Sequence, residues 1–144
     1  MTCIAWDGRT LAADKRACLG GLVNTMTKIH RIGDLLVGGS GETSFIWTMI
    51  EWVRAGRNVA DFPKSQGDKD DWQPMLVIES GGQILLYERT PYPCRYEQSV
   101  FAIGSGRDFA RAAMHLGKSA REAVEVACAL DAGCGNGIDT LVLE

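Results

Sequence analysis

The sequence predicts an α+β fold in which two stacked, mainly antiparallel sheets lie between helical layers. Short apolar segments separated by glycine-rich turns recur along the chain, and this pattern is typical of β-hairpins. Apolar residues at helical spacing are confined to one stretch in the first half and two consecutive stretches near the C-terminus. This segregation of hairpins and helices favours α+β over a parallel α/β sheet. We expect residues 1–144 to form one domain.

Composition argues against several classes of function. The content of 46% hydrophobic and 23% charged residues is ordinary for a globular protein, and the formal net charge of −3 argues against nucleic-acid binding. No apolar run approaches the roughly 20 residues of a membrane span, and the N-terminus lacks the pattern of a signal peptide. We therefore expect a cytoplasmic protein whose partners include neither nucleic acid nor a membrane.

Cysteine and histidine usage is consistent with this compartment. The five cysteines are odd in number and include no C-x-x-C pair, so neither a disulfide framework nor a zinc site is expected. The two histidines, His30 and His115, offer little material for a Ser-His-Asp triad. We expect a reducing environment, no metal and no cofactor.

The first hairpin brings a carboxylate to the chain end. Residues 2–6 and 10–14 read as short apolar strands around the turn at Asp7 and Gly8. A two-residue turn would place Thr2 opposite Ala13, and a three-residue turn would place it opposite Asp14. Either register brings Asp14 near Thr2, although a strand-end aspartate can also simply cap a turn.

A second hairpin brings a lysine to a glycine-rich strand end. After the break at Gly20 and Gly21, residues 27–32 alternate apolar and polar, and residues 35–39 return as the next strand. With Ile32 opposite Leu35, Lys28 falls opposite Gly39. A single strand lysine is most often solvated, so this position alone does not establish a function.

A helix is expected to follow the glycine-rich stretch 38–41 and to stop near Gly56. Glu42, Thr43 and Ser44 suit its N-terminus, and the apolar stripe that follows is core. The stretch is no phosphate loop, because no Gly-Lys-Ser/Thr follows it. Its N–H groups could, however, stabilise an oxyanion.

Residues 60–74 are predicted to form a long loop, either a binding lid or a plain connection.

The second half contains a further hairpin, a strand, two helices and a final strand. The hairpin strands are predicted at 75–80 and 83–88, and Pro91 and Pro93 mark an irregular passage. The capping box formed by Ser119 and Glu122 begins the second of the two helices. The strands and helices expected after the prolines span residues 98–103, 108–116, 120–130 and 138–143.

Thr2 is a candidate nucleophile because it follows Met1. An initiator methionine before a small residue is usually excised, which would leave a threonine with a hydroxyl and a free α-amine. That amine titrates at about 7.7–8.0, so near neutral pH it can accept a proton from the hydroxyl. The alternative is that Thr2 is only a common second residue.

Three stretches together resemble a known family. They are the opening from Thr2 through residues 11–17, the strand at 27–29, and residues 102–106. In order and spacing they resemble proteasome β-type subunits, which are N-terminal-nucleophile hydrolases, and most closely the peptidase subunit of the bacterial ATP-dependent two-component protease. The resemblance implies a four-layer αββα sandwich and assembly into stacked homo-oligomeric rings. The helical layer after the first helix would be reduced, since residues 60–74 replace a second helix.

The resemblance also implies roles for individual residues. The catalytic set would be Thr2, Asp14, Lys28, Gly41 and Ser105, with Gly41 supplying an oxyanion N–H group. Supporting residues would be Arg16, Asp131 and Cys134, where Cys134 stands in place of the usual serine. The substrate would contact open sheet edges and a pocket for a neutral side chain, formed by Gly20, Gly21, Met26, His30, Gly39 and Thr43.

The function expected from these residues is that of a threonine peptidase acting on unfolded polypeptide inside a ring, with an ATP-dependent unfoldase as a possible partner. Two alternatives remain open at the level of sequence. One is a non-catalytic ring of the same fold. The other is an amide hydrolase that uses the same nucleophile on a small metabolite.

Overall fold

The sandwich has two main sheets, and the first contains the strands nearest to both ends of the chain. The structure is a computed structural model that describes residues 1–64 and 73–144. The strands of this sheet pair in the order β10-β1-β2-β11, and each pair is antiparallel. Their bounds are β1 Ile4–Trp6, β2 Thr10–Asp14, β10 Phe101–Ile103 and β11 Ile138–Val142.

The second sheet is antiparallel throughout and pairs its strands in sequence order, β5-β6-β7-β8-β9. Its register places Ile32 opposite Leu35, as predicted. Lys28, the residue just before β5, therefore falls opposite Gly39 at the end of β6. The bounds are β5 Ile29–Ile32, β6 Leu35–Gly39, β7 Met75–Ile78, β8 Ile84–Tyr87 and β9 Cys94–Tyr96.

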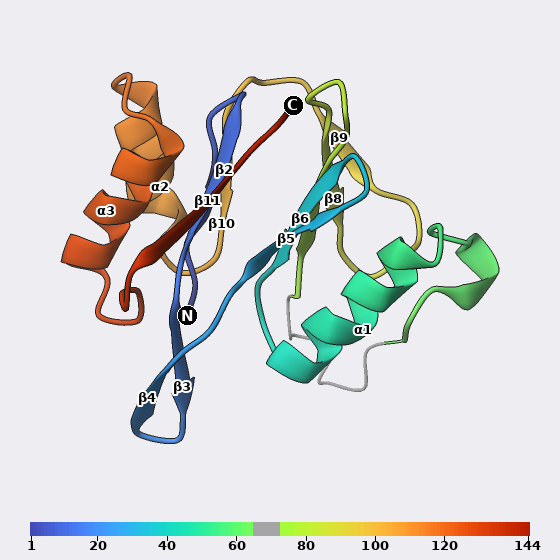
Figure 1. The fold of residues 1–144 in the computed structure, drawn as a ribbon, viewed down its shortest axis with the longest axis horizontal. Coiled ribbons are helices and arrows are strands. Elements are labelled where there is room, and N and C mark those ends of the chain that lie inside the picture. Colours follow the sequence, from blue (N-terminus) through green and yellow to red (C-terminus); the bar gives the residue numbers. More distant parts are fainter. Residues whose placement is uncertain (65–72) are drawn as a thin grey trace.

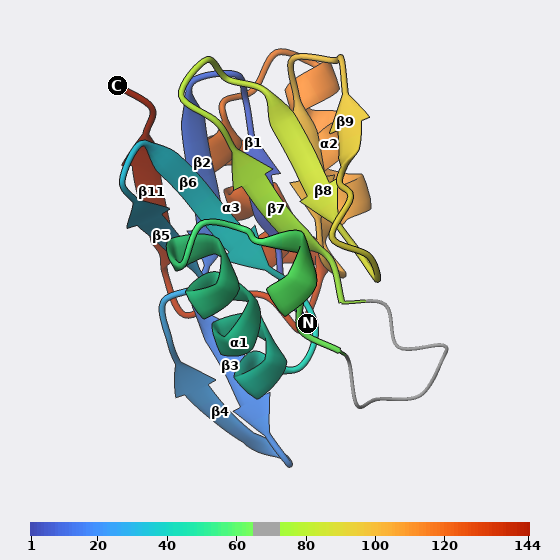
Figure 2. The same ribbon diagram turned by 90° about the vertical axis from the view of Figure 1, so that its right-hand side faces the viewer.

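Helices cover the outer faces of both sheets, so the layers follow the order αββα (Figures 1 and 2). Helices α2 (Arg107–His115) and α3 (Ala120–Leu130) pack on the first sheet, and α1 (Thr43–Arg54) packs on the second. A short 3₁₀ helix, η1 (Val59–Asp61), follows α1. The predicted α+β sandwich is confirmed. Of the predicted loop 60–74, residues 65–72 lie outside the described residues.

Three apolar cores hold the layers together. The central core lies between the sheets, where Ile4, Trp6 and Leu11 of the first sheet meet Leu36, Leu76 and Ile84 of the second. Small residues such as Ala12, Ala123 and Ala127 fill the core under α2 and α3, which allows the helices to approach the sheet closely. Larger side chains, among them Trp52 and Tyr87, fill the core under α1.

The predicted register of the first hairpin is wrong. Ile4 pairs with Ala13 and Trp6 with Leu11, so Asp14 lies opposite Cys3 rather than opposite Thr2. The turn is longer than expected because the Asp7 carboxylate accepts hydrogen bonds from the N–H groups of Arg9 and Thr10. The predicted proximity of Asp14 to Thr2 is nevertheless correct, since the Asp14 side chain spans the difference.

Three strands were not predicted. Strands β3 (Arg16–Leu19) and β4 (Leu22–Thr25) form a hairpin with its turn at Gly20 and Gly21, and this hairpin projects from the sandwich (Figure 1). Strand β9 follows Pro93, at the edge of the second sheet, where proline is tolerated. The predicted 2–6 and 98–103 strands are shorter than expected, whereas α3 and its capping box are confirmed.

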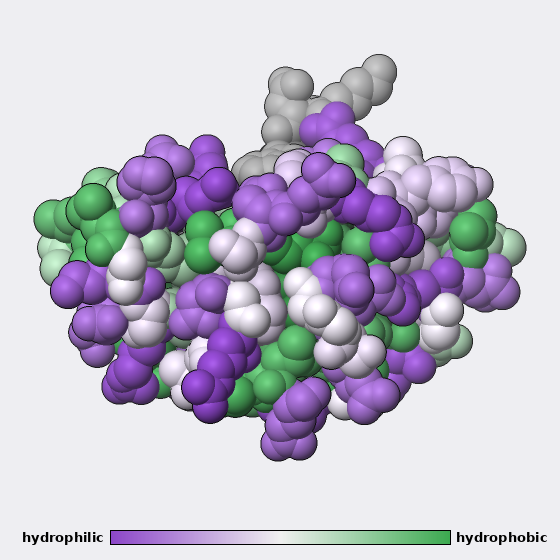
Figure 3. Space-filling view, turned by 90° about the horizontal axis from the view of Figure 1, so that it is seen from above, coloured by the Kyte–Doolittle hydropathy of each residue, from purple (hydrophilic) through white to green (hydrophobic). Residues whose placement is uncertain are grey.

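The face of the molecule drawn in Figure 3 is mainly polar. Hydrophilic residues dominate the face seen from above, with smaller groups of hydrophobic residues between them (Figure 3). Within residues 1–64 and 73–144, no helix has the length and apolar character needed to cross a bilayer.

Candidate active site

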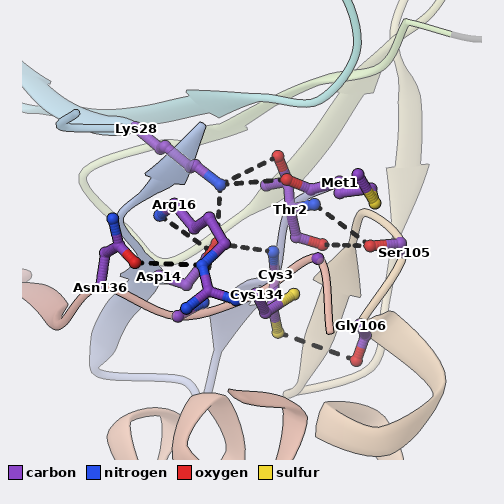
Figure 4. A network of polar contacts seen from close by, with 12 residues as sticks. Met1, Thr2, Cys3, Asp14, Arg16, Lys28, Ser105, Gly106, Cys134 and Asn136 are labelled. Carbon is purple, nitrogen blue, oxygen red and sulfur yellow. Dashed lines mark hydrogen bonds and ion pairs between the residues drawn. The ribbon is translucent and has the colours of Figure 1, made fainter. Parts of the chain in front are cut away.

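Thr2 lies two residues before the start of β1, beside a buried lysine and a buried aspartate (Figure 4). The Lys28 ammonium group donates hydrogen bonds to Thr2 Oγ1 at 3.3 Å and to Asp14 Oδ1 at 2.9 Å. The exposed fractions are 7% for Thr2, 8% for Lys28 and 0% for Asp14. A hydroxyl, a cation and a carboxylate are thus held together away from bulk water. In such a buried environment charges interact more strongly than they do in water.

Backbone N–H groups fix the Asp14 carboxylate in place. Oδ1 accepts from Cys3 N–H at 3.0 Å, and Oδ2 accepts from Arg16 N–H at 3.2 Å and from Gly135 N–H at 3.1 Å. These bonds, together with the ion pair to Lys28, offset the cost of burying a carboxylate. Asp14 therefore forms a rigid anchor for Lys28.

Ser105, in the turn between β10 and α2, contacts the backbone of Thr2. Its Oγ accepts a hydrogen bond from Thr2 N–H at 3.2 Å and donates one to Asp131 Oδ2 at 2.7 Å. Asp131 also accepts from Gly133 N–H at 2.9 Å and from the Cys134 thiol at 3.4 Å. The bonds from Ser105 and Gly133 N–H lower the pKa of Asp131. Cys134 thus makes a hydrogen bond at the position where the resemblance implies serine.

Arg16 links β3 to the turn between α3 and β11. Its Nη1 donates to Ala132 O at 2.8 Å, and its Nε donates to Asn136 Oδ1 at 3.0 Å. A Cβ atom at Gly135 would lie 2.7 Å from Arg16 Nη2, so a side chain there would displace the guanidinium group. The turn that contacts Asp14 is therefore held from two directions.

A hollow next to Thr2 and Lys28 is lined by residues of the first hairpins and by the start of α1. Two of its lining residues, Gly41 and His30, bear directly on the chemistry. Gly41 has a φ of +119°, and its N–H group has no hydrogen-bond partner within residues 1–64 and 73–144. The His30 ring lies 4.9 Å from that of Trp47, and burial followed by the charge of Arg54 lowers the pKa of His30. The residues of the predicted set that line the hollow are Thr2, Arg16, Met26, Lys28, His30, Gly39, Gly41 and Thr43.

The structure does not bring all predicted residues to this hollow. Gly20 and Gly21 form the exposed turn of the β3–β4 hairpin and are not among the lining residues. Their role in substrate binding stays a prediction. Asp14, Ser105 and Cys134 are among the residues labelled in Figure 4 but not among the lining residues of the hollow, and Asp131 is not a lining residue either.

Two buried cysteines next to the site are poor nucleophiles. Burial, and then the charges of Asp14 and Asp131, raise the pKa of the Cys134 thiol to about 12. Burial is also the main cause that raises the pKa of Cys3. Because the thiolate is the reactive form, Thr2 is a better candidate nucleophile than the adjacent Cys3. All five cysteines are free.

No metal centre is evident in the part of the chain that the structure describes, since it has no cluster of three or more suitable His, Cys, Asp or Glu side chains. The described residues bring together a threonine hydroxyl, a lysine ammonium group and a carboxylate, with backbone N–H groups around them.

Sequence reasoning missed several backbone contributions. Gly106 N–H donates to Thr2 O at 3.0 Å, and a Cβ atom at Gly104 would lie 2.1 Å from the same oxygen. Gly135 and Asn136 were also missed as neighbours of the site. The signal was present in the sequence, because glycines flank Ser105 and Cys134 on both sides.

Comparison with solved structures establishes the fold independently. No family model matches the chain, and no curated protein sequence does. Thiobacillus denitrificans BPH in complex with epoxomicin superposes with a TM-score of 0.75 at 20% identity, covering 100% of this chain and 98% of that one. A second structure of the same BPH gives a TM-score of 0.74 at 20% identity, with the same coverage.

Eukaryotic HslV from Trypanosoma brucei gives a TM-score of 0.73 at 22% identity, covering 99% of this chain and 98% of that one. Sequence identities this low support similarity of the fold alone. The structural similarity extends over nearly the whole length of both chains. The αββα sandwich expected from the resemblance to proteasome β-type subunits is therefore confirmed.

Proposed function

We propose that this chain is a threonine-type peptidase whose nucleophile is Thr2 Oγ1 once the bond between Met1 and Thr2 has been cut. One observation carries the proposal above all others. Lys28 Nζ lies 3.3 Å from Thr2 Oγ1 and 2.9 Å from Asp14, and all three groups are buried. A structural lysine has no need of a threonine hydroxyl, whereas a nucleophilic hydroxyl gains from a nearby cation that stabilises its deprotonated form.

The first chemical step is acylation of Thr2. The free α-amine takes the hydroxyl proton, directly or through one water molecule, while the oxygen attacks a peptide carbonyl carbon. The Gly41 N–H group, which has no partner in the described residues, is the proposed donor to the resulting oxyanion. A comparable donor is worth roughly 3 kcal/mol in other hydrolases.

The second step completes hydrolysis. The protonated amine gives its proton to the leaving amine as the C–N bond breaks, and an ester remains on Thr2 Oγ1. Water then attacks the ester carbonyl carbon while the amine accepts a proton from it. The amine returns this proton to Thr2 Oγ1 as the ester C–O bond breaks, which releases the second product as a carboxylic acid. The contact of Ser105 Oγ with Thr2 N, at 3.2 Å, supports a role for Ser105 and Asp131 in orienting that amine.

Met1 blocks the site as long as it is attached. Thr2 N is then an amide nitrogen, which is not a base near neutral pH. The Met1 carbonyl accepts a hydrogen bond from Lys28 Nζ at 3.1 Å, and its side chain lies against Gly133. Met1 also lines the hollow next to Thr2. Loss of Met1 would therefore free the amine, one hydrogen bond of Lys28 and part of the substrate site together.

The lining of the hollow supports polypeptide substrates with a neutral side chain before the cut. Met26, Trp47 and the neutral His30 lie along it. We propose self-association into rings, consistent with the exposed apolar residues Leu19 and Leu116, and an ATP-dependent unfoldase that delivers unfolded chains. A monomeric mass for the active protein in native mass spectrometry would contradict the ring.

The test compares Thr2→Ala and Thr2→Ser with the wild type on a fluorogenic peptide that carries a neutral residue before the cut. Thr48→Ala is the matched control, because Thr48 is an exposed threonine of α1. We expect wild-type turnover in the control, reduced turnover in Thr2→Ser, and a loss of at least about 1,000-fold in Thr2→Ala. Wild-type activity in a folded Thr2→Ala protein would contradict the proposal. Since epoxomicin binds the structurally similar BPH, its inhibition of this turnover is a useful second readout.

A further inference from the structure

The turn between α3 and β11 has an unusual backbone. Gly135, Asn136 and Gly137 follow one another with φ values of +158°, +65° and +103°. Glycines on either side of Asn136 make this segment costly to order, since glycine loses more conformational freedom than any other residue. Some contact outside the turn must therefore fix its path.

The same turn contributes directly to the candidate site. Gly135 N–H donates to Asp14 Oδ2 at 3.1 Å, and Gly135 O accepts from Lys15 N–H at 2.9 Å. Asp14 in turn anchors Lys28, which contacts the Thr2 hydroxyl. The position of one glycine N–H group therefore bears on the position of the lysine.

Asn136 adds a further anchor for the turn through its side-chain amide. Its Oδ1 accepts from Arg16 Nε at 3.0 Å, as Figure 4 shows. Its Nδ2 donates to Asn24 O at 3.0 Å and to Thr25 Oγ1 at 2.9 Å. One side chain thus ties the turn to both strands of the β3–β4 hairpin, and Arg16 on that hairpin lines the hollow.

We propose that Asn136 is a positioning residue of the threonine peptidase site, which holds Gly135 N–H on Asp14 and so keeps Lys28 against Thr2. This inference rests on the proposed function for its effect on turnover. Its structural part, the anchoring of the turn, does not depend on that function.

Asparagine is well suited to this position for two physical reasons. Its side chain tolerates left-handed φ values better than most residues do. Its amide also provides an acceptor for Arg16 together with donors for Asn24 O and Thr25 Oγ1. Glycine would meet only the first requirement. Aspartate would also tolerate the left-handed φ, but it would keep the acceptor for Arg16 and lose the donors for Asn24 O and Thr25 Oγ1.

The experiment compares Asn136→Gly and Asn136→Asp with Asn58→Gly, a control in which an asparagine that caps η1 is lost. Steady-state kinetics on a fluorogenic peptide are measured together with amide hydrogen exchange of peptides that cover residues 131–137. For Asn136→Gly we expect kcat to fall at least 10-fold with KM within 2-fold of wild type, and exchange in the turn to accelerate at least 10-fold. Asn136→Asp should recover part of kcat because it retains the contact with Arg16.

The outcomes separate the two ideas. Unchanged exchange in Asn136→Gly overturns the anchoring, whereas a fall in kcat that Asn58→Gly shares overturns the positioning of the catalytic groups. Faster exchange with unchanged kcat overturns the positioning of the catalytic groups. A wild type that never cleaves peptides overturns the proposed function, whereas the exchange data then still decide whether Asn136 holds the turn.

Discussion

At the scale of single residues, the site depends on one buried ion pair. Lys28 and Asp14 lie 2.9 Å apart with side-chain exposures of 7% and 0%. Such a pair adds little net stability compared with apolar residues, but removing one partner leaves the other charge buried and uncompensated. In the proposed function, Asp14 holds the Lys28 ammonium group against the Thr2 hydroxyl.

Asp14→Asn should therefore destabilise the fold and abolish peptidase activity. The substituted amide cannot accept hydrogen bonds at both of its ends, and Lys28 loses its counter-charge. We expect the free energy of unfolding to fall by about 3–5 kcal/mol in urea titrations. Asp139→Asn is the control, because Asp139 forms a more exposed pair with Lys15 and its loss should cost no more than about 1 kcal/mol. Equal losses in the two variants would contradict the account.

Because the thiol of Cys134 is buried, we predict that the free energy of unfolding decreases at alkaline pH. The pKa of Cys134 is raised to about 12, so the folded state keeps a proton that the unfolded state releases above about pH 9. The unfolded state then binds fewer protons, and the free energy of unfolding must decrease as pH rises between these values. Cys134→Ser should make this decrease shallower by up to one proton, while leaving stability at pH 7 near wild type. Identical slopes of urea midpoint against pH would rule out this explanation.

Sequence reasoning at the residue scale succeeded where contacts were local. The first hairpin placed Asp14 beside Thr2, because strand register fixes which residues are neighbours. The second hairpin placed Lys28 only opposite Gly39, and its link to Thr2 came from the resemblance to a family. Asp131 and Ser105 are different, because they are 26 residues apart in the chain and more than 100 residues from Thr2. Only the resemblance to a family pointed to them. Asn136 was missed altogether, since nothing local predicts its three distant partners.

At the scale of elements, turn chemistry decided what could be predicted. The first hairpin was found, but its register was not, because Asp7 accepts two N–H groups and enlarges the turn. The β3–β4 hairpin was missed because Gly20 and Gly21 can serve a turn or a close approach equally well. Strand β9 is exposed along its whole length and has no burial pattern to detect. Helix α3 was predicted accurately from its capping box.

Asp7 also caps a distant helix, which gives a prediction at this scale. Its Oδ2 accepts a hydrogen bond from Ala120 N–H at 2.8 Å, at the first turn of α3. Asp7→Ala should lower the free energy of unfolding by about 1–2 kcal/mol through loss of this cap and of the turn. Asp34→Ala, in the exposed turn between β5 and β6, is the control and should cost less than about 0.5 kcal/mol. A smaller effect at Asp7 than at Asp34 would refute the capping role.

At the scale of the whole molecule, the site lies where the two main sheets meet the turn between α3 and β11. Thr2 precedes a strand of the first sheet, Lys28 precedes a strand of the second, and Asp131 follows α3. The central core fixes the sheets relative to each other, so the distance from Lys28 to Thr2 is set by packing far from the reaction. The layer order was predictable from the segregation of hairpins and helices. The meeting of Thr2, Lys28 and Asp131 was not predictable from local sequence, because it depends on how whole layers stack.

The central claim is that a free Thr2 is the nucleophile, and one mass measurement tests it most directly. Purified protein is incubated with a peptide that carries a hydroxyl-reactive electrophile, and its intact mass and modified residue are then determined. We predict a chain that lacks Met1 and carries a single adduct, which maps to Thr2 and is absent from Thr2→Ala. A chain that retains Met1 yet cleaves peptides, or a chain without Met1 whose adduct forms at another residue, would contradict the claim.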